Sequence, residues 1–402
     1  MGNTCFSNTF PRWCEHVSYE KNCFNHTEKV CECSIDFKGL AESAEYTFQC
    51  LHWIESVSVS DSITFSLKKA RPDDVSVLSL QNPEILLKMF KDDEMFVSFK
   101  HIRGTPQYWK EMQHDMLAKI RHYGPYTFFI SCSAADFHWP ELIQIVAKQY
   151  GEHYDLDYIA TEMDKITKRN WLARNPVTIA RHIDFIFRKL WGNVILSGLH
   201  PVGQILNYDI RKEIQSRGTA HFHSAVHVKE APIIDKNSDE GIISFVDKYV
   251  RGVVPNDDEQ LRDLVVSRQM HHHARTCRKK KGLECRFHFP KHPSQATVVS
   301  RVPVRENSKQ IVQQARTMIH QVMNTLREMG TDHTLHDILT QSGVTTQDYN
   351  DALKISMKKT TVIMKRSPSN TCINPYNPVI LKSIRANMDI QFITDVWACV
   401  RT

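Results

Sequence analysis

The chain has 402 residues, of which 41% are hydrophobic and 24% are charged, with a formal net charge of +6. This length suits two or three domains, and the composition is that of a globular protein rather than a disordered one. The sequence lacks both a run of about 18 apolar residues and a signal-peptide pattern. We therefore expect an intracellular protein with no membrane partner. The mild positive charge permits a nucleic-acid partner without requiring one.

The N-terminal segment differs in composition from the rest of the chain. Residues 1–60 are rich in cysteine, which in an intracellular chain indicates metal binding or burial before disulfides. The spacings there match no zinc-ligand pattern, so we treat 1–60 as a Cys-rich segment of unassigned role.

Helical and strand patterns alternate through the next part of the chain. Apolar residues at helical spacing predict two helical pieces within 76–122. A short apolar strand follows at 127–131, and then a helix at 139–150 with Pro140 in its first turn. Residues 176–199 read as a further amphipathic helix. Helices and strands are therefore both expected in this part of the chain.

The strongest strand signal lies at 204–230. In 205–215, every second residue is apolar and the intervening residues are polar, which predicts one buried and one polar face. The apolar residues of this strand are Leu206, Tyr208, Ile210 and Ile214. Gly218 permits a tight turn, after which Phe222, Val226 and Val228 continue the apolar face. We expect helices to cover the apolar face of this hairpin.

The polar face of the hairpin gathers possible metal ligands near its turn. His221 and His223 are alternate residues, about 6.6 to 7 Å apart along a strand, so their imidazoles can converge on one ion. Glu213 or Gln215 could supply a third ligand from the neighbouring strand. His227 faces the same way but lies further from the turn, so it is the least favoured candidate metal ligand. Imidazole and oxygen ligands without cysteine suit Mn²⁺ or Mg²⁺. The alternative is a histidine-rich solvent face that binds nothing.

A second candidate metal site lies in "MHHHARTCRKKKGLECRFHFP". Two histidines and two cysteines within about 20 residues fit a structural, tetrahedral Zn²⁺ site. The four ligands that we predict are His271, His273, Cys277 and Cys285. His272 and His288 are alternates, and the competing interpretation is a basic loop with incidental histidines.

Basic residues follow the first of these cysteines. They form a solvated face, or they neutralise DNA phosphates, or they serve as a nuclear-import patch. We take Arg278, Lys279 and Lys280, with Arg217 at the hairpin turn, as candidate DNA contacts. A nucleic-acid partner and a nuclear location are therefore expectations that these residues permit.

The C-terminal part begins with a long helix at about 307–329. Its apolar stripe comprises Ile311, Val312, Ala315, Ile319, Val322 and Leu326. Residues 360–402 alternate short strand-like pieces with Asn/Pro turns. A Gly-x-x-x-x-Gly-Lys-Ser/Thr phosphate loop is absent from the sequence, so we expect no ATP hydrolysis of that kind.

Several of these segments together resemble one family. "EIQSRGTAHFHSAVHV" is similar to Glu-Phe-Gln-x-Arg-Gly-x-x-His-x-His of the replication-initiator domain of Helitron transposons, a His–hydrophobe–His (HUH) single-strand endonuclease. Blocks before and after the hairpin, over about 95–400, resemble the family in order and spacing. The resemblance implies an α+β fold, with an antiparallel HUH-type sheet flanked by helices, a small His/Cys insertion and a helical C-terminal part, and it implies single-stranded DNA as the partner.

The resemblance also implies a reaction and a division of the chain. The family cleaves single-stranded DNA with a tyrosine, leaves a 5′-phosphotyrosine, and uses the metal as a Lewis acid. We expect the core at 95–235, the His/Cys/basic segment at 236–300, and an incomplete C-terminal part at 301–402. The family's tyrosine segment would follow Thr402, so we expect no catalytic residue within the chain.

Two functions therefore remain open at the level of sequence. One is metal-dependent nicking and strand transfer of single-stranded DNA, defective in this chain. The other is a non-catalytic DNA-binding remnant of a transposon protein. A third interpretation is a transposon remnant that has no present function. Other tyrosines are poor substitutes for the nucleophile: Tyr154 and Tyr158 precede the hairpin, and Tyr349 and Tyr376 lie outside the expected motif.

Overall fold

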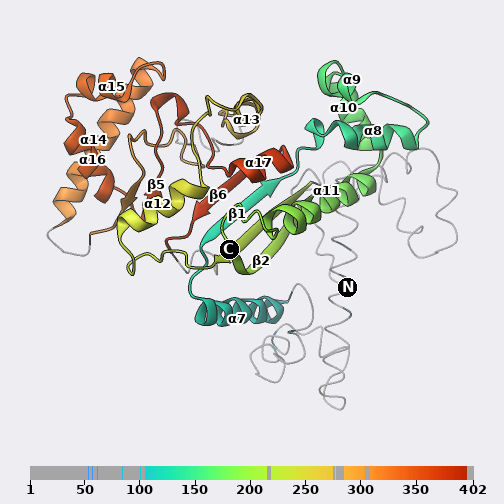
Figure 1. The fold of residues 1–402 in the computed structure, drawn as a ribbon, viewed down its shortest axis with the longest axis horizontal. Coiled ribbons are helices and arrows are strands. Elements are labelled where there is room, and N and C mark those ends of the chain that lie inside the picture. Colours follow the sequence, from blue (N-terminus) through green and yellow to red (C-terminus); the bar gives the residue numbers. More distant parts are fainter. Residues whose placement is uncertain are drawn as a thin grey trace, which may run out of the picture.

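The computed structural model describes residues 105–214, 219–274, 277, 285–303 and 308–395, together with Trp53, Val57, Asp61, Glu84 and Lys100. Most of the Cys-rich segment 1–60 therefore lies outside the described residues. In Figure 1 a sheet occupies the middle of the molecule, with one group of helices at each end. The described chain is α+β, as the sequence predicts.

A four-stranded antiparallel sheet forms the centre of the fold (Figure 1). Its strands are β1 (Phe128–Ser133), β2 (Ile205–Ile214), β3 (Ala220–Val228) and β6 (Met388–Phe392). The order across the sheet is β2-β3-β1-β6. The last strand along the chain therefore pairs with the first, and a C-terminal segment completes the sheet.

Helices cover the apolar face of the sheet. The helix α11 (Pro176–Leu190) begins at the N-cap Asn175, whose side chain accepts a hydrogen bond from the Thr178 amide. Its Phe187 ring stacks on Phe222 of β3 with centroids 3.7 Å apart. A second helix, α12 (Asp239–Tyr249), places Phe245 against Phe128 of β1 at 5.6 Å. Aromatic pairs of this kind contribute beyond the area that they bury.

The helix α7 (Pro106–Tyr123) lies against the opposite face (Figure 1). The Thr105 side chain caps its start, and Gly124, with φ +83°, ends it. Met116 of α7 packs with Tyr126 and Ala225, so the helix covers one end of this face. We call this face the His face, because β3 places the half-buried His221 and His223 on it.

The edge strand β2 departs from the prediction. Helices cover the apolar residues of β3, but those of β2 remain exposed. Their exposed fractions are 47% for Leu206, 38% for Tyr208, 37% for Ile210 and 40% for Ile214. These side chains stay exposed because β2 lies at the edge of the sheet, whereas α11 packs on β3. Conversely, the polar Asp209 is half-buried beside α7, where Lys119 Nζ lies 2.6 Å from its carboxylate.

The C-terminal helices form a second core. The helix α14 (Ser308–Met329) confirms the predicted long helix and packs with α15 (Leu335–Ser342) and α16 (Thr346–Ile355). Val322 and Leu326 are buried there, whereas Ile311 is 56% exposed. The predicted apolar stripe is therefore covered only from Ala315 onward, since α15 and α16 do not reach the first turns.

The remaining elements connect these units. They are η2 (Asp136–His138), α8 (Pro140–Gln149), α9 (Leu156–Thr161), α10 (Lys165–Arg174), η3 (Trp191–Ile195), α13 (Glu259–Leu264), η4 (Val265–Gln269), β4 (Val298–Ser300), β5 (Thr361–Ile363), η5 (Pro368–Asn370) and α17 (Pro378–Ile384). The strands β4 and β5 pair with each other. None of the described helices combines the length and the apolar character that crossing a membrane requires.

The stacked Phe222–Phe187 pair is expected to be a main support of the sheet. We predict that Phe222→Ala lowers the free energy of unfolding by about 3–5 kcal/mol, because it removes a fully buried ring and leaves a cavity. Urea titration followed by circular dichroism measures this change. The matched control is Phe185→Ala, since Phe185 lies on the same helix α11 and is 56% exposed. A loss in the control as large as in Phe222→Ala would contradict the packing described here.

Candidate functional site

The pairing of β3 with its neighbours brings His221, His223 and Glu213 together. His221 lies opposite Glu213 of β2 and opposite Ser133 of β1. The rings of His221 and His223 have centroids 4.5 Å apart. His223 Nε2 lies 3.0 Å from a Glu213 carboxylate oxygen, and His221 Nδ1 lies 3.0 Å from Ser133 Oγ. The predicted neighbours therefore meet on the His face.

The His223 imidazole has an unsatisfied nitrogen. Its Nδ1 is buried and has no hydrogen-bond partner in the described part of the chain. A buried polar atom without a partner is costly unless a ligand or water satisfies it. His221, His223 and Glu213 carry ligand types that bind divalent cations, but the Glu213 carboxylate contacts Nε2 of His223, so the orphaned Nδ1 and Glu213 face different sides of the imidazole. The third candidate, Gln215, lies outside the described residues.

His227 is not part of this site. It faces the same side of β3 but is only 1% exposed, because α7 and the following loop cover it. Its ring stacks on Tyr126 with centroids 4.0 Å apart, and neither ring nitrogen makes a hydrogen bond of normal geometry. Burial lowers the pKa of His227, and the nearby Pro125 carbonyl and Asp209 charge only partly offset that effect. His227 is therefore a neutral packing residue, and the prediction of it as an outside ligand is wrong.

A row of polar residues crosses the sheet next to the histidines. Residues paired across antiparallel strands share one face, so Arg211, His223, Ser131 and Asp389 lie side by side. Ser131 and Asp389 were not predicted as site residues. The sequence carries no signal for them, because β6 is separated from β1 by more than two hundred residues and only its pairing brings Asp389 into the row.

A chain of hydrogen bonds links the histidines to a further cation. Ser133, which contacts His221, donates its backbone N–H to the Asn387 carbonyl at 2.9 Å. The Asn387 side chain in turn donates to the Arg268 carbonyl at 2.7 Å. Arg268 belongs to η4, so this helical turn is held at the end of β1 where His221 lies. The sequence analysis missed Arg268.

Arg268 belongs to a group of basic residues at this end of the sheet. Its Nε is buried without a hydrogen-bond partner in the described part of the chain. Burial, followed by the positive charges of Arg268, Lys168 and Lys165, lowers the pKa of His138 to about 4. We call Arg268, Lys165 and Lys168 the strand-end basic cluster. An unpaired, partly buried guanidinium beside two lysines is suited to binding an anion such as phosphate.

The second predicted metal site has the expected geometry. The ligand atoms of His271, His273, Cys277 and Cys285 all lie within 4.8 Å of one another. In the described residues this is the one group of three or more such side chains that closes in this way. His271 Nε2 lies 3.3 Å from Cys285 Sγ, and His273 Nδ1 lies 3.6 Å from Cys277 Sγ. The alternates His272 and His288 are not members of the group.

The environment of this group favours the metal-binding forms of its side chains. Burial opposes ionisation of Cys285, but backbone hydrogen bonds from Phe289 and Phe287 and the charge of Lys291 lower its pKa overall. Burial and the neighbouring cations lower the pKa of His271. A thiolate and a neutral imidazole are the forms that bind Zn²⁺. Two histidines and two cysteines make a complete tetrahedral set, which suits a structural ion.

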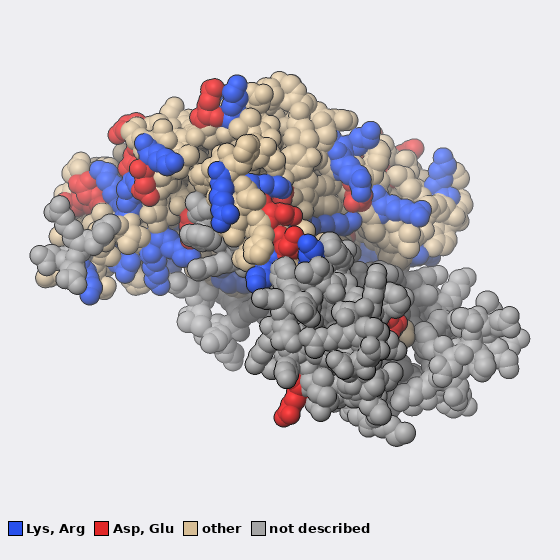
Figure 2. All heavy atoms as spheres, turned by 90° about the horizontal axis from the view of Figure 1, so that it is seen from below, with Lys and Arg blue, Asp and Glu red and all other residues tan. Residues whose placement is uncertain are grey.

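The four residues predicted to contact DNA are not among the described residues. Arg217, Arg278, Lys279 and Lys280 all lie outside the described residues. Their role as DNA contacts stays a prediction. Figure 2 shows Lys and Arg side chains spread over the described part of one face, with Asp and Glu among them. The basic side chains on the described part of this face are therefore interspersed with acidic ones and do not form one continuous patch.

The described C-terminal tyrosines are structural. Tyr349 and Tyr376 are both fully buried. The Tyr349 hydroxyl donates to the Pro293 carbonyl, and the Tyr376 hydroxyl donates to the Val253 carbonyl. Burial raises the pKa of Tyr349 and raises that of Tyr376 to about 12. Neither phenol is therefore placed to act as a nucleophile, as the sequence analysis expected.

The comparison with known families concerns the part of the chain that contains His221 and His223. Residues 79–226 match the family model of the Helitron helicase-like domain at the N-terminus. The chain carries a Helitron-like N-terminal domain. The matched segment includes α7, β1, α8 to α11 and β2, and it reaches Val226 of β3, so it contains both His221 and His223. The His/Cys group lies beyond the matched segment. No curated protein matches the chain.

We predict that the Helitron-like chain purifies with about one equivalent of zinc. Cys285→Ser and His271→Ala should lose the metal and lower the melting temperature, because binding of a structural ion adds directly to folding stability. Elemental analysis and thermal unfolding measure both effects. His272→Ala and Cys372→Ser are matched controls, since they alter neighbouring side chains outside the group and should keep the metal. Full zinc content in Cys285→Ser would contradict the assignment.

We also predict that His227 makes the Helitron-like fold sensitive to acid. Because its folded pKa is depressed, its contribution to stability is complete above the unfolded pKa of about 6.5 and falls as the pH drops below that value. His227→Phe should keep the stack on Tyr126 and lose less stability between pH 7.5 and pH 5 than the parent. Urea midpoints at the two pH values test this. The exposed His153→Phe is the control and should lose as much as the parent.

Proposed function

We propose that this chain is a Helitron-type replication-initiator module that binds single-stranded DNA across the His face with the help of a divalent cation. The Helitron-like domain already relates it to transposon replication proteins. The observation that carries the finer proposal is the pair His221 and His223 on the His face, with the orphaned Nδ1 of His223.

The chemistry of the ligands selects the cation. His221 and His223 would hold it through imidazole nitrogens, and Glu213 would add a carboxylate oxygen. A set without cysteine suits Mn²⁺ or Mg²⁺, which keep positions open for phosphate oxygens. When bound, such an ion polarises a phosphodiester for nucleophilic attack. Ser133, at 3.0 Å from His221 Nδ1, would orient the imidazole as a hydrogen-bonding partner.

The strand-end basic cluster supports a DNA strand at the same place. The Arg268 backbone carbonyl is connected to His221 through Asn387 and Ser133, so η4 lies beside the strand end that carries His221. Guanidinium and ammonium groups position nucleic acids by neutralising phosphates. We propose that the strand passes from this cluster across the His face, with a backbone phosphate at His221 and His223.

The family reaction would use a tyrosine at this site. The tyrosine oxygen attacks phosphorus, the bond from phosphorus to the 3′ oxygen breaks, and the 3′-hydroxyl leaves with a proton. The 5′-phosphotyrosine conserves the ester energy for strand joining. Because Tyr349 and Tyr376 are buried and hydrogen-bonded, a second candidate function is DNA binding without cleavage by this chain.

We predict that Mn²⁺ strengthens binding of a single-stranded oligonucleotide and that His221→Ala and His223→Ala remove this gain. The expected loss is roughly tenfold or more, the size of a lost charge-assisted contact. Fluorescence anisotropy with and without Mn²⁺ measures it, and His153→Ala is the exposed control.

A denaturing gel then separates the two candidate functions. A covalent protein–DNA band that depends on His221 supports cleavage by this chain. Binding without such a band supports the non-catalytic module. If neither Mn²⁺ nor the histidine variants change the affinity for DNA, the proposed role of the His face is wrong.

A further inference from the structure

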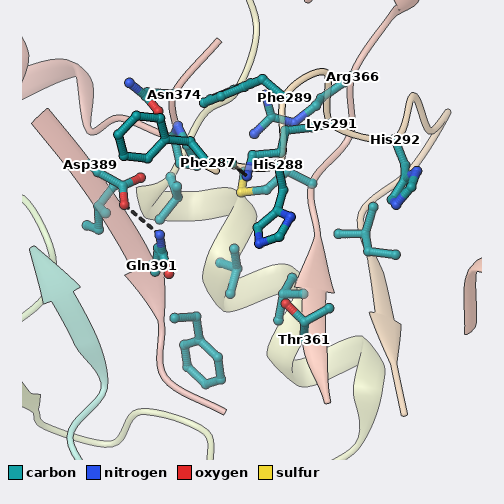
Figure 3. Close-up of a pocket in the computed structure, with 18 of the residues that line it drawn as sticks. Phe287, His288, Phe289, Lys291, His292, Thr361, Arg366, Asn374, Asp389 and Gln391 are labelled. Carbon is teal, nitrogen blue, oxygen red and sulfur yellow. Dashed lines mark hydrogen bonds between the residues drawn. The ribbon is translucent and has the colours of Figure 1, made fainter. Parts of the chain in front are cut away.

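A cavity of about 550 Å³ lies between β6 and the small β4–β5 sheet. Its upper wall is the segment that follows the zinc ligand Cys285, and α12 closes its floor (Figure 3). Phe287, His288 and Lys291 come from the upper segment, and Asp389 comes from β6. Neither site described above uses the interior of this cavity.

The cavity carries excess positive charge. Lys291 and Arg366 both line it, and neither forms an ion pair with a carboxylate in the described part of the chain. Arg366 is only 4% exposed, and its Nη1 donates to the Asn370 and Ile373 carbonyls. Asp389 is the carboxylate that faces both: burial raises its pKa, and the charges of Lys291 and Arg366 oppose that rise. Two cations beside one carboxylate leave an excess of positive charge, which favours an anionic occupant.

The cavity also offers an aromatic surface. Phe287 is 46% exposed although it is a large apolar side chain. The buried Phe289 stacks on the proposed zinc ligand His271 with centroids 4.5 Å apart, and Phe287 packs against the same imidazole with centroids 5.7 Å apart. An exposed ring supported in this way is suited to stacking with a planar ligand such as a nucleobase.

His288 is held in a strained conformation at the same wall. Its φ is +57°, a left-handed value that is uncommon outside glycine. Its amide donates to the Cys285 carbonyl at 2.8 Å, so the zinc ligand fixes the turn. In Figure 3 the His288 imidazole points into the cavity. Strain of this kind persists where surrounding structure imposes it, and it is concentrated at ligand sites.

The cavity adjoins the His face. Asp389 pairs with Ser131 of β1, and Ser131 pairs with His223 of β3. Because neighbouring strands lie about 4.8 Å apart, Asp389 is about 10 Å from His223 along this row. A strand whose phosphate lies at His223 can therefore place a nearby nucleotide at the cavity.

We propose that this cavity is a nucleotide subsite, in which one base of the bound single strand stacks on Phe287 and its phosphate contacts Lys291 and His288. Arg366 contributes charge from the wall, and the Asn374 and Gln391 amides can hydrogen-bond the base edge. The inference rests on the proposed function, since the ligand is a nucleotide of the same DNA strand. It gives the zinc-held segment a direct role in DNA recognition.

The test uses single-stranded oligonucleotides with 2-aminopurine at successive positions, because stacking on an aromatic ring changes its fluorescence. We expect one position to respond when the full chain binds. Phe287→Ala should abolish that response and weaken binding roughly tenfold, the loss expected for one stacked base. His288→Gly removes the imidazole while suiting the left-handed backbone, so it should weaken binding without unfolding the chain. Lys354→Ala, an exposed lysine on α16, is the control.

The outcomes separate this subsite from the proposed function. His221→Ala should remove the effect of Mn²⁺ but keep the position-specific fluorescence response. If DNA binds and the response is the same in Phe287→Ala, His288→Gly and the parent, the subsite is overturned. If DNA does not bind but a free nucleoside monophosphate does, and Phe287→Ala weakens it, the subsite stands and the proposed function fails. If neither ligand binds, both are overturned.

Discussion

The register of β3 between its two neighbours determines the arrangement of the whole His face. His221 lies opposite Ser133, and both histidines point away from the apolar layer. Because side chains alternate along a strand, a slip of one residue would turn both imidazoles toward α11 and expose Phe222. The stacked Phe222–Phe187 pair makes that slip costly. Packing on one face of β3 therefore holds the candidate metal ligands on the other.

Two candidate metal sites of different chemistry lie on either side of this sheet arrangement. The His/Cys group supplies four ligands and leaves no open position, which suits a structural ion. The pair His221 and His223 supplies two imidazoles and leaves room for oxygen ligands. The first would shape the segment that carries Phe287 and His288, and the second would contact a phosphate. Asp389 of β6 lies in the same row as His223 and lines the cavity near Phe287, so the proposed nucleic-acid path would run past both.

Local patterns in the sequence predicted much of the structure and part of the site. Period-two alternation identified β2 and β3, helical spacing identified α11 and α14, and ligand spacing identified the His/Cys group. Alternation alone could not predict that β2 is an edge strand whose apolar face stays exposed. It also could not predict that α7 buries His227, because coverage depends on where distant helices pack.

The sequence by itself determined which side chains share a face of the hairpin and which residues have the spacing of a tetrahedral metal site, since strand and turn geometry follow from local residues. Only the tertiary structure decided their neighbours. Ser133 is 88 residues from His221, and Arg268 and Asp389 come from later parts of the chain. Pairing between such distant segments depends on the packing of the complete core, which local periodicity does not specify.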